Sequence, residues 1–482
     1  MRIEKDLLGE LELEDDVYYG IQTERACQNF AVSGRTIAEY PYLIKCMAYI
    51  KKAAAMSNYH VDALKAEEKH AICRAADEII NGKMENQFPV DIYQAGGGIS
   101  VNMNINEVIA NRANELLTGH KGYDSIHPNQ HVNMSQSTND VLPSAMKMAC
   151  FLYLEDLLKS LNKMEDILKE KTKEFHYIVK IARTCLQDAV PITLGQQFSS
   201  YLSFITRQIK EMKSLQKECL SIVIGATAVG TGIGTVPGYT EKIYEYLQEV
   251  SHLPVVKEEN FFDGLQNADI YLKISGALKG LSTGLSKMAS DLRLLSSGPR
   301  AGLAEIHLPS VQPGSSIMPG KINPCIPEMM IQVCFDVYGN DQTITFAVDR
   351  GELELNIWEP IILKNIFDSF TILTKAISLF TDKCLEGIQA NEAVCLKNAE
   401  NSLSLSVVLS SLFGYELANQ IVLEAYEKNI TIKEGAINKG LLSKKEADEY
   451  LNPVNLTDPV KILQILNKKR MGERLATSYH PC

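Results

Sequence analysis

The chain has 482 residues, and its 48 Lys and Arg side chains against 59 Asp and Glu side chains give a formal net charge of −11. Apolar residues make up 45% of it and charged residues 22%, which is typical of globular proteins and excludes an apolar-poor disordered chain. The acidic balance argues against a nucleic-acid scaffold, because phosphate binding needs clustered Lys and Arg. The length predicts roughly two to four domains.

The 11 cysteines are scattered and form no C-x-x-C pair, which favours free thiols in a reducing cytoplasm. Residues 1–6 contain no apolar signal core. The longest uncharged stretch, residues 219–240, is too rich in Gly and Thr for a membrane helix, so we interpret it as a helix end running into a turn. We therefore expect a cytoplasmic protein without a membrane partner.

The elements that the pattern predicts are mainly helical. A short strand is expected over residues 90–93. Apolar residues then recur at three- and four-residue steps in three runs, which predicts long helices over 144–175, 198–219 and 274–295. Helices of this length usually pack as a bundle. We divide the chain provisionally into an N-terminal domain (1–140), a central long-helix domain (141–394) and a small helical C-terminal domain (395–482).

Three polar segments interrupt the helices. In the first, residues 133–140, Ser137, Thr138 and Asn139 are short hydrogen-bonding side chains that could hold a carboxylate, although helix capping is the more frequent role of these residues. In the second, residues 183–191, Thr184 precedes Gln187, and a turn or a cap is the simple interpretation.

The third polar segment, residues 313–324, is the most informative. Its prolines and glycines make helix or strand improbable. Ser315 could act as a base if backbone N–H groups and the ammonium of Lys321 stabilised its alkoxide. A polar surface loop without chemistry is an equally open interpretation, since loops carry both kinds of residue.

We expect no metal centre, because the sequence has neither an H-E-x-x-H motif nor a cysteine cluster. His127 and His131 are four residues apart, but Pro128 disfavours a helical histidine pair and a solvated turn is expected there.

Residues 314–324 resemble the signature of the aspartase/fumarase superfamily. Residues 135–140 and 186–196 resemble its first and second shared regions, and further similarity covers residues 88–94 and 291–300. Leu186 and Val190 are similar to the residues that aspartases have in the second region. Residues 127–129, which lie outside that region, instead resemble the corresponding residues of fumarases. The resemblance extends over almost the whole chain and is weakest in the last hundred residues.

The resemblance implies an L-aspartase-like, mainly α fold whose central bundle builds a twenty-helix core in a homotetramer. Each active site would draw on three subunits, and the reaction, elimination of ammonia from L-aspartate to give fumarate, would need no cofactor. Ser315 and Lys321 would be the catalytic residues, with Ser315 as general base through an enediolate intermediate. Candidate substrate-binding residues are Ile99, Ser100, Ser137, Thr138, Asn139, Thr184, Cys185, Ser316, Met318 and Asn323.

Two positions depart from the superfamily pattern. The superfamily usually has threonine where Ile99 stands, and histidine or glutamine where Cys185 stands. Isoleucine removes one hydroxyl donor from the expected carboxylate cradle, and unpaired polar substrate groups are costly in a closed site. The alternatives are therefore an amine lyase acting on another β-substituted amino acid or betaine, as ergothionase does, a class II fumarase, or a non-catalytic relative such as a lens crystallin.

Overall fold

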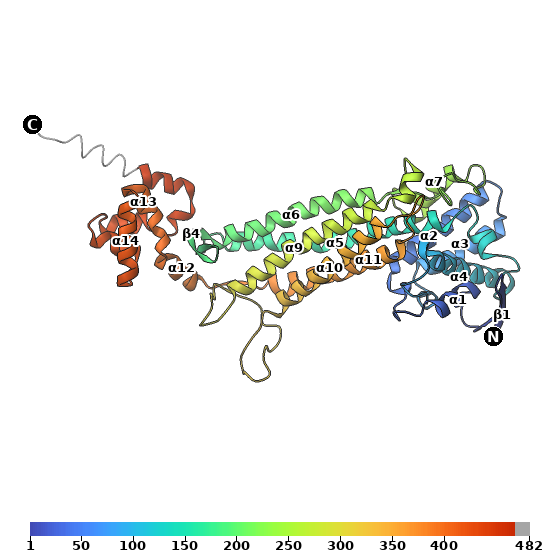
Figure 1. Ribbon diagram of the computed structural model, residues 1–482, viewed down its shortest axis with the longest axis horizontal. Helices are drawn as coiled ribbons and strands as arrows, with labels where there is room; N and C mark the ends of the chain where they lie inside the picture. Colours follow the sequence, from blue (N-terminus) through green and yellow to red (C-terminus); the bar gives the residue numbers. More distant parts are fainter. Residues whose placement is uncertain (468–482) are drawn as a thin grey trace, which may run out of the picture. The chain divides into compact units, whose positions relative to one another are not determined.

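The computed structural model describes residues 1–467, and the chain is mainly helical, as the sequence predicts (Figure 1). Its internal contacts divide it into two compact units. Unit 1 comprises Met1–Ser160, Gln208–Thr283 and Gln332–Lys375. Unit 2 comprises Leu161–Arg207, Gly284–Ile331 and the described residues from Ala376 onward. The division of the chain at residues 140 and 394 stays a prediction.

The longest helices are α5 (Thr138–Glu174), α6 (Leu194–Glu218), α9 (Asp269–Leu295), α10 (Cys325–Asp349) and α11 (Glu359–Phe380). Each of them contributes residues to both units. The three periodic runs of the sequence correspond to α5, α6 and α9, so these predictions are confirmed. Their apolar stripes are the buried faces: Leu161, Ile205 and Leu281 have no exposed surface.

Specific polar contacts fix how the long helices pack within unit 1. The Tyr271 hydroxyl of α9 donates to the Pro143 carbonyl of α5 over 3.1 Å. The Ser275 hydroxyl of α9 donates to Asp341 of α10 over 2.7 Å. The Pro143 carbonyl lies inside α5, and its oxygen can accept this second hydrogen bond because it has two lone pairs. These contacts hold the first part of α5 in place, and that part carries several candidate site residues.

The other elements of unit 1 are short strands and further helices. They include the antiparallel hairpin β1 (Arg2–Asp6) and β2 (Gly9–Leu13), the helices α1 (Ile21–Asn29), α2 (Pro41–His60), α3 (Ala66–Ile80), α4 (Ile99–Thr118), α7 (Tyr239–Ser251) and α8 (Phe261–Gln266), and the short parallel pair β5 (Ser221–Ile222) and β6 (Val256–Lys257). Helix α2 packs against both α3 and α7.

Two short segments show what the pattern predicts well and badly. After α6, the stretch 219–240 forms the two-residue strand β5 and then turns, so the expected helix end and turn are confirmed. The strand expected over residues 90–93 is wrong, because only an isolated bridge joins Asp91 to Thr36. The Asp91 carboxylate accepts hydrogen bonds from the N–H groups of Ser33 and Tyr93, and these bonds turn the chain instead of extending it.

Unit 2 has small sheets and short helices besides its parts of the long helices. Its elements are the hairpin β3 (Val179–Thr184) and β4 (Gln187–Thr193), the pair β7 (Ile306–His307) and β8 (Gln389–Ala390), and the helices α12 (Glu392–Asn401), α13 (Ser406–Phe413), α14 (Tyr415–Lys428), α15 (Ile432–Asn438) and α16 (Lys444–Tyr450). Helices α13 to α16 bury a separate apolar cluster that includes Leu409, Ile421 and Ala436.

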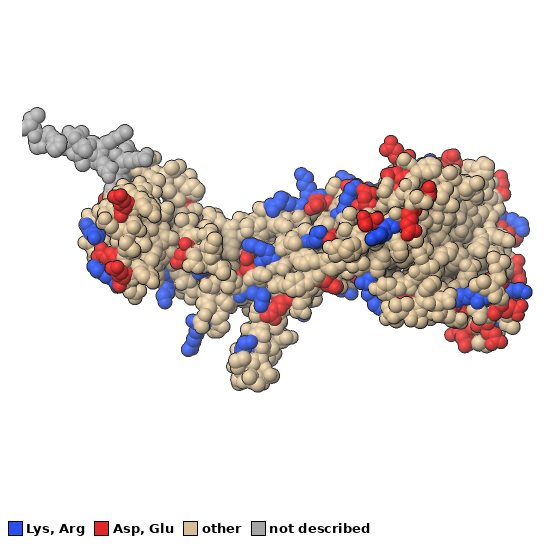
Figure 2. All heavy atoms as spheres, viewed as in Figure 1, with Lys and Arg blue, Asp and Glu red and all other residues tan. Residues whose placement is uncertain are grey.

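The charged side chains, the cysteines and the polarity of the helices can be compared with the sequence predictions. On the face shown in Figure 2, Lys and Arg side chains are interspersed with Asp and Glu. The cysteines of the described part of the chain are all free. Within residues 1–467, the helices are too short or too polar for any of them to cross a membrane.

Glu359, the first residue of α11, is an unusual buried carboxyl group. It is 4% exposed, and its Oε2 atom has no hydrogen-bond partner among the described residues. Burial raises the pKa of Glu359 well above its ordinary value of 4.5, because the apolar surroundings disfavour the charged form. The folded protein therefore keeps a proton that the unfolded chain releases.

We expect Glu359 to make the folded protein less stable as the pH rises. Its contribution is fully present below about pH 4.5 and is lost toward the raised pKa, at about 1.4 kcal/mol per pH unit. The neutral Glu359→Gln variant should lack this loss, so urea unfolding at about pH 5 and about pH 9 should show a smaller decrease than in the wild type. An equal decrease in both proteins would contradict the assignment.

Candidate functional site

The first turn of α4 is brought close to α5 by glycines. Gly97 and Gly98 have φ angles of +68° and +73°, which L side chains rarely adopt. A Cβ atom on Gly98 would lie 2.1 Å from Leu142 of α5. Glycine is therefore required for the close approach, and it places Ile99 and Ser100 at the N-terminus of α4 beside the start of α5.

The polar segment at residues 133–140 is partly helical, which corrects the interpretation of it as a loop. Helix α5 begins at Thr138. The Ser137 hydroxyl accepts a hydrogen bond from the N–H of Asn139 over 3.3 Å, and Asp140 Oδ1 accepts one from the N–H of Ser137 over 2.9 Å. These reciprocal bonds cap the helix, so the capping interpretation is confirmed for Ser137. Burial raises the pKa of Asp140 to about 6.

The N-termini of α4 and α5 lie side by side. The Asn102 side chain of α4 donates from Nδ2 to Thr138 Oγ1 of α5 over 2.8 Å. Asn139 donates from Nδ2 to the Ala228 carbonyl over 2.8 Å, which leaves Asn139 Oδ1 as an acceptor. Because helix N-termini present unpaired N–H groups and a partial positive charge, their junction favours an anion. The structure thus brings together the candidate residues of unit 1, which are Ile99, Ser100, Ser137, Thr138 and Asn139.

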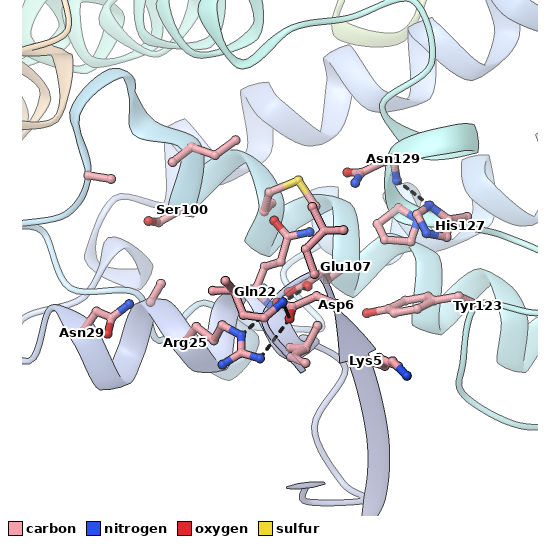
Figure 3. Close-up of a pocket in the computed structure, with 18 of the residues that line it drawn as sticks. Lys5, Asp6, Gln22, Arg25, Asn29, Ser100, Glu107, Tyr123, His127 and Asn129 are labelled. Atoms are coloured by element: carbon pink, nitrogen blue, oxygen red, sulfur yellow. Dashed lines mark hydrogen bonds and ion pairs between the residues drawn. The ribbon is translucent and has the colours of Figure 1, made fainter. Parts of the chain in front are cut away.

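A cavity of about 720 Å³ adjoins this junction, and Ile99 and Ser100 line it (Figure 3). Ser100 is 7% exposed, whereas Ile99 is 45% exposed. Figure 3 shows the Arg25 guanidinium of α1 pointing to Asp6 of β1, with hydrogen bonds of 2.8 and 2.9 Å. The sequence pattern did not indicate these two residues, because an Arg–Asp pair 19 positions apart leaves no local signal.

Of the two histidines that the sequence singled out, His127 lines this cavity (Figure 3). His127 precedes a single π-helical turn (Pro128–Val132), so the expected turn is confirmed. The N–H of His127 donates to His131 Nδ1 over 2.8 Å, and burial together with His131 lowers the pKa of His127. Across residues 1–467, no group of three or more His, Cys, Asp or Glu side chains is arranged to hold a metal ion.

In unit 2, the second polar segment forms the β3–β4 hairpin rather than a loop. Its two turn residues, Cys185 and Leu186, have φ angles of +53° and +62°, as the tightest hairpin turns require. Neither is Gly, Asn or Asp, so the sequence carried no hairpin signal. Thr184 ends β3, and both Thr184 and Cys185 are exposed. Arg183 anchors the strand through a 2.8 Å ion pair with the fully buried Glu305.

The third polar segment is irregular, as the sequence predicts. The Ser315 oxygen accepts hydrogen bonds from the N–H groups of Ile317 (3.2 Å) and Met318 (2.9 Å). Two backbone donors on one hydroxyl oxygen stabilise negative charge there, as an alkoxide base needs.

A second set of contacts closes this segment into a ring. Lys321 Nζ donates to Asn323 Oδ1 over 2.8 Å, and Asn323 Nδ2 donates to the Gly314 carbonyl over 2.9 Å. Gly314 has to be glycine, because a Cβ atom would lie 2.5 Å from the Asn323 nitrogen. The structure describes no hydrogen bond between Lys321 and Ser315. Ile317 and Met318 are 83% and 50% exposed, so the segment presents apolar side chains to its surroundings.

The candidate residues therefore form three groups on one chain: the α4–α5 junction in unit 1, and the Thr184–Cys185 turn and the segment with Ser315, Ser316, Met318, Lys321 and Asn323 in unit 2. Sequence reasoning missed the buried polar residues behind the junction, above all Lys51 and Asn102. A weak signal existed, since Asn102, Asn104 and Asn106 alternate with apolar residues in a segment that forms a helix.

Comparison with known proteins identifies the family of the chain. A family model described as "Lyase" matches residues 9–339, and one described as "Fumarase C C-terminus" matches residues 407–458. The chain is 45% identical over 460 residues to an aspartate ammonia-lyase of Helicobacter pylori, covering 95% of this chain and 98% of the relative. It is 46% identical over 460 residues to an aspartate ammonia-lyase of Bacillus subtilis, covering 95% and 96%.

A solved structure supports the same assignment. The structure of a fumarate lyase:delta crystallin from Brucella melitensis bound to cobalt superimposes with a TM-score of 0.92 at 42% identity, covering 95% of this chain and 100% of that chain. The sequence, the long-helix fold and the relatives all agree, and the chain therefore belongs to the aspartase/fumarase superfamily of lyases.

Proposed function

We propose that the protein is a cytoplasmic carbon–nitrogen lyase that eliminates ammonia from L-aspartate to give fumarate, with Ser315 as the general base. The observation that carries this proposal is the pair of backbone N–H groups on the Ser315 oxygen, because a serine removes a proton from carbon only if its alkoxide is stabilised. The relatives named aspartate ammonia-lyase support the choice of substrate.

In the first step, the Ser315 alkoxide takes a proton from Cβ of aspartate. The electron pair of the C–H bond moves into the β-carboxylate, which becomes an enediolate with two negative charges. Donors that are already aimed at this carboxylate lower the barrier, because their interaction strengthens as the charge develops. We assign this task to Ser100, Ser137, Thr138 and Ser316, three of which lie at the junction of two helix N-termini.

In the second step, the electron pair returns to form the carbon–carbon double bond, and the bond from Cα to nitrogen breaks. Nitrogen leaves with its electron pair as ammonia. Ser315 releases its proton to solvent, where ammonia takes one up, so that aspartate gives fumarate and ammonium. Asn139 Oδ1 is free to accept a hydrogen bond from the amine. Thr184, Lys321 and Asn323 would hold the α-carboxylate.

We propose further that three subunits of a homotetramer supply the three groups of residues. The exposed Ile317, Met318 and Leu186 side chains support this, because large apolar side chains gathered on loops are typical of surfaces that become covered.

The direct test is to supply the purified protein with L-aspartate and with a panel of other β-substituted amino acids and betaines. Ammonia and fumarate should appear from aspartate in equal amounts. No fumarate and no ammonia from aspartate, together with hydration of fumarate to malate, would replace the proposal by a fumarase activity. If the protein releases no ammonia from aspartate but releases an amine from another compound of the panel, the substrate is that compound and the elimination mechanism is kept.

Ile99 and Cys185 favour that second candidate, an amine lyase on a different β-substituted substrate. Ile99 lines the cavity, is half-exposed and offers an apolar side chain where the superfamily usually has a hydroxyl. Cys185 is exposed at the hairpin turn next to Thr184. A substrate whose β-substituent is less polar than a carboxylate would fit these two positions better.

The Ile99→Thr variant separates the two candidates. If aspartate is the substrate, the added hydroxyl contributes one hydrogen bond of about 0.5–1.5 kcal/mol, so kcat/KM for aspartate should rise about 2- to 10-fold. Ile99→Val serves as the control, because it shortens the side chain without adding a donor. A fall in kcat/KM for aspartate with Ile99→Thr would show that the apolar side chain is needed.

A further inference from the structure

Lys51 of α2 is a fully buried lysine, with no exposed surface. Its ammonium donates to Asn102 Oδ1 over 2.9 Å, to Asn133 Oδ1 over 3.0 Å and to Gln136 Oε1 over 3.0 Å. All three acceptors are neutral amides, whereas buried lysines are normally paired with a carboxylate. Such an arrangement is costly to bury, so a purely structural contact between α2 and α4 is a poor explanation for it.

The three amide acceptors lead directly to the carboxylate cradle. Because an ammonium has donors only, it forces the Asn102 oxygen to face Lys51 and the Asn102 nitrogen to face away. That nitrogen donates to Thr138 Oγ1 over 2.8 Å. The Thr138 oxygen is thus occupied as an acceptor, and its own proton is left for another partner. The Thr138 hydroxyl is therefore available as a donor.

Asn133 holds this arrangement in place. Its Oδ1 atom accepts hydrogen bonds from Lys51, from Asn102 over 3.2 Å and from Asn106 over 3.1 Å. Its Nδ2 atom donates to the Gln136 carbonyl over 3.1 Å, at the start of the segment that carries Ser137 and Thr138. Every amide around Lys51 therefore has a single favourable orientation. Without the Lys51 ammonium, the Asn102 amide could turn its oxygen toward Thr138 and accept a hydrogen bond from the Thr138 hydroxyl.

We propose that Lys51 is a positioning residue that acts through Asn102 to keep the Thr138 hydroxyl oriented as a donor to the substrate carboxylate. This inference rests on the proposed function, in which Thr138 belongs to the enediolate cradle. Burial lowers the pKa of Lys51 to about 7, while the charge of the Asp140 carboxylate favours the protonated form.

A double-mutant cycle on the full-length enzyme tests the link. Thr138→Val and Lys51→Met should each lower kcat/KM for aspartate by about 10²–10³-fold, with most of the loss in kcat, because the donor acts on the transition state. The double variant should lose no more than Thr138→Val alone, because without the hydroxyl there is nothing left to orient. Lys52→Met is the matched control: Lys52 is the next residue of α2, but it bonds to Asp77, and its kcat/KM should stay unchanged.

Multiplicative losses in the double variant would overturn the proposal, since independent structural damage adds in free energy. Lys51→Gln is the second variant, in case Lys51→Met does not fold. It keeps a polar side chain without charge, and it must show the same coupling to Thr138→Val. If the wild type releases no fumarate from aspartate, the proposed function fails by itself, and the cycle is then measured on whichever panel substrate the wild type deaminates.

Discussion

Replacing Ser315 by alanine should lower kcat for aspartate by about 10²–10⁴-fold, the range expected when a positioned general base is removed. KM should change little, because the hydroxyl acts on the Cβ proton and makes no carboxylate contact in the proposed reaction. The two backbone donors on its oxygen, from Ile317 and Met318, would remain in the variant without an acceptor. Steady-state kinetics with fumarate detection measures the effect.

Ser310→Ala is the matched control for this experiment. Ser310 is exposed and lies just before the same irregular segment, where it has no assigned role. Its variant should keep wild-type kcat and KM. A Ser315→Ala enzyme within a few-fold of wild type would remove the proposed base and leave the rest of the site without a mechanism.

Lys321 is exposed in the structure and would be covered when the proposed site binds aspartate. Replacing Lys321 by methionine should then lower kcat/KM for aspartate by about 30- to 5,000-fold, the effect of truncating one partner of a buried charge pair. In the proposal, its ammonium holds the α-carboxylate in both the ground state and the transition state, so the larger part of the loss should appear in KM. Lys321 also bonds to Asn323, which in turn closes on Gly314, so some loss of kcat through the geometry of the segment should accompany it.

The control for this variant is Lys397→Met, which removes an exposed lysine from α12 of the same unit. Addition of alkylamines to the Lys321→Met enzyme should restore no more than part of the activity. An unchanged KM with a reduced kcat would assign Lys321 to proton transfer or to support of Ser315 instead of carboxylate binding.

The sequence predicts the long helices well because their apolar stripes repeat over many turns, as along α5 and α9. It also predicts the irregular segment around Ser315, since proline and glycine exclude other structures. The β3–β4 hairpin could not be predicted, because its turn consists of Cys185 and Leu186 in a conformation that usually selects glycine or asparagine.

The candidate site shows a similar division. Residue types and the resemblance were sufficient to select Ser137 and Thr138, but they could not show that Ser137 caps α5 while Thr138 faces Asn102. The position of Lys51 depends on partners 51, 82 and 85 residues away, and no local pattern encodes such contacts. Hydrogen bonds between buried polar groups that are far apart in the chain therefore cannot be predicted from a single sequence.

Subunit complementation tests most directly whether Ser315 acts on a substrate held by another chain. Ser315→Ala and Thr138→Val chains, each nearly inactive, are mixed after dissociation and reassembled. If the two residues reach one site from different subunits, random hybrids should recover about a quarter of wild-type activity, because some sites then receive both intact residues. Hybrids that stay as inactive as their parents would show that one chain supplies both residues, or that Ser315 is not the base.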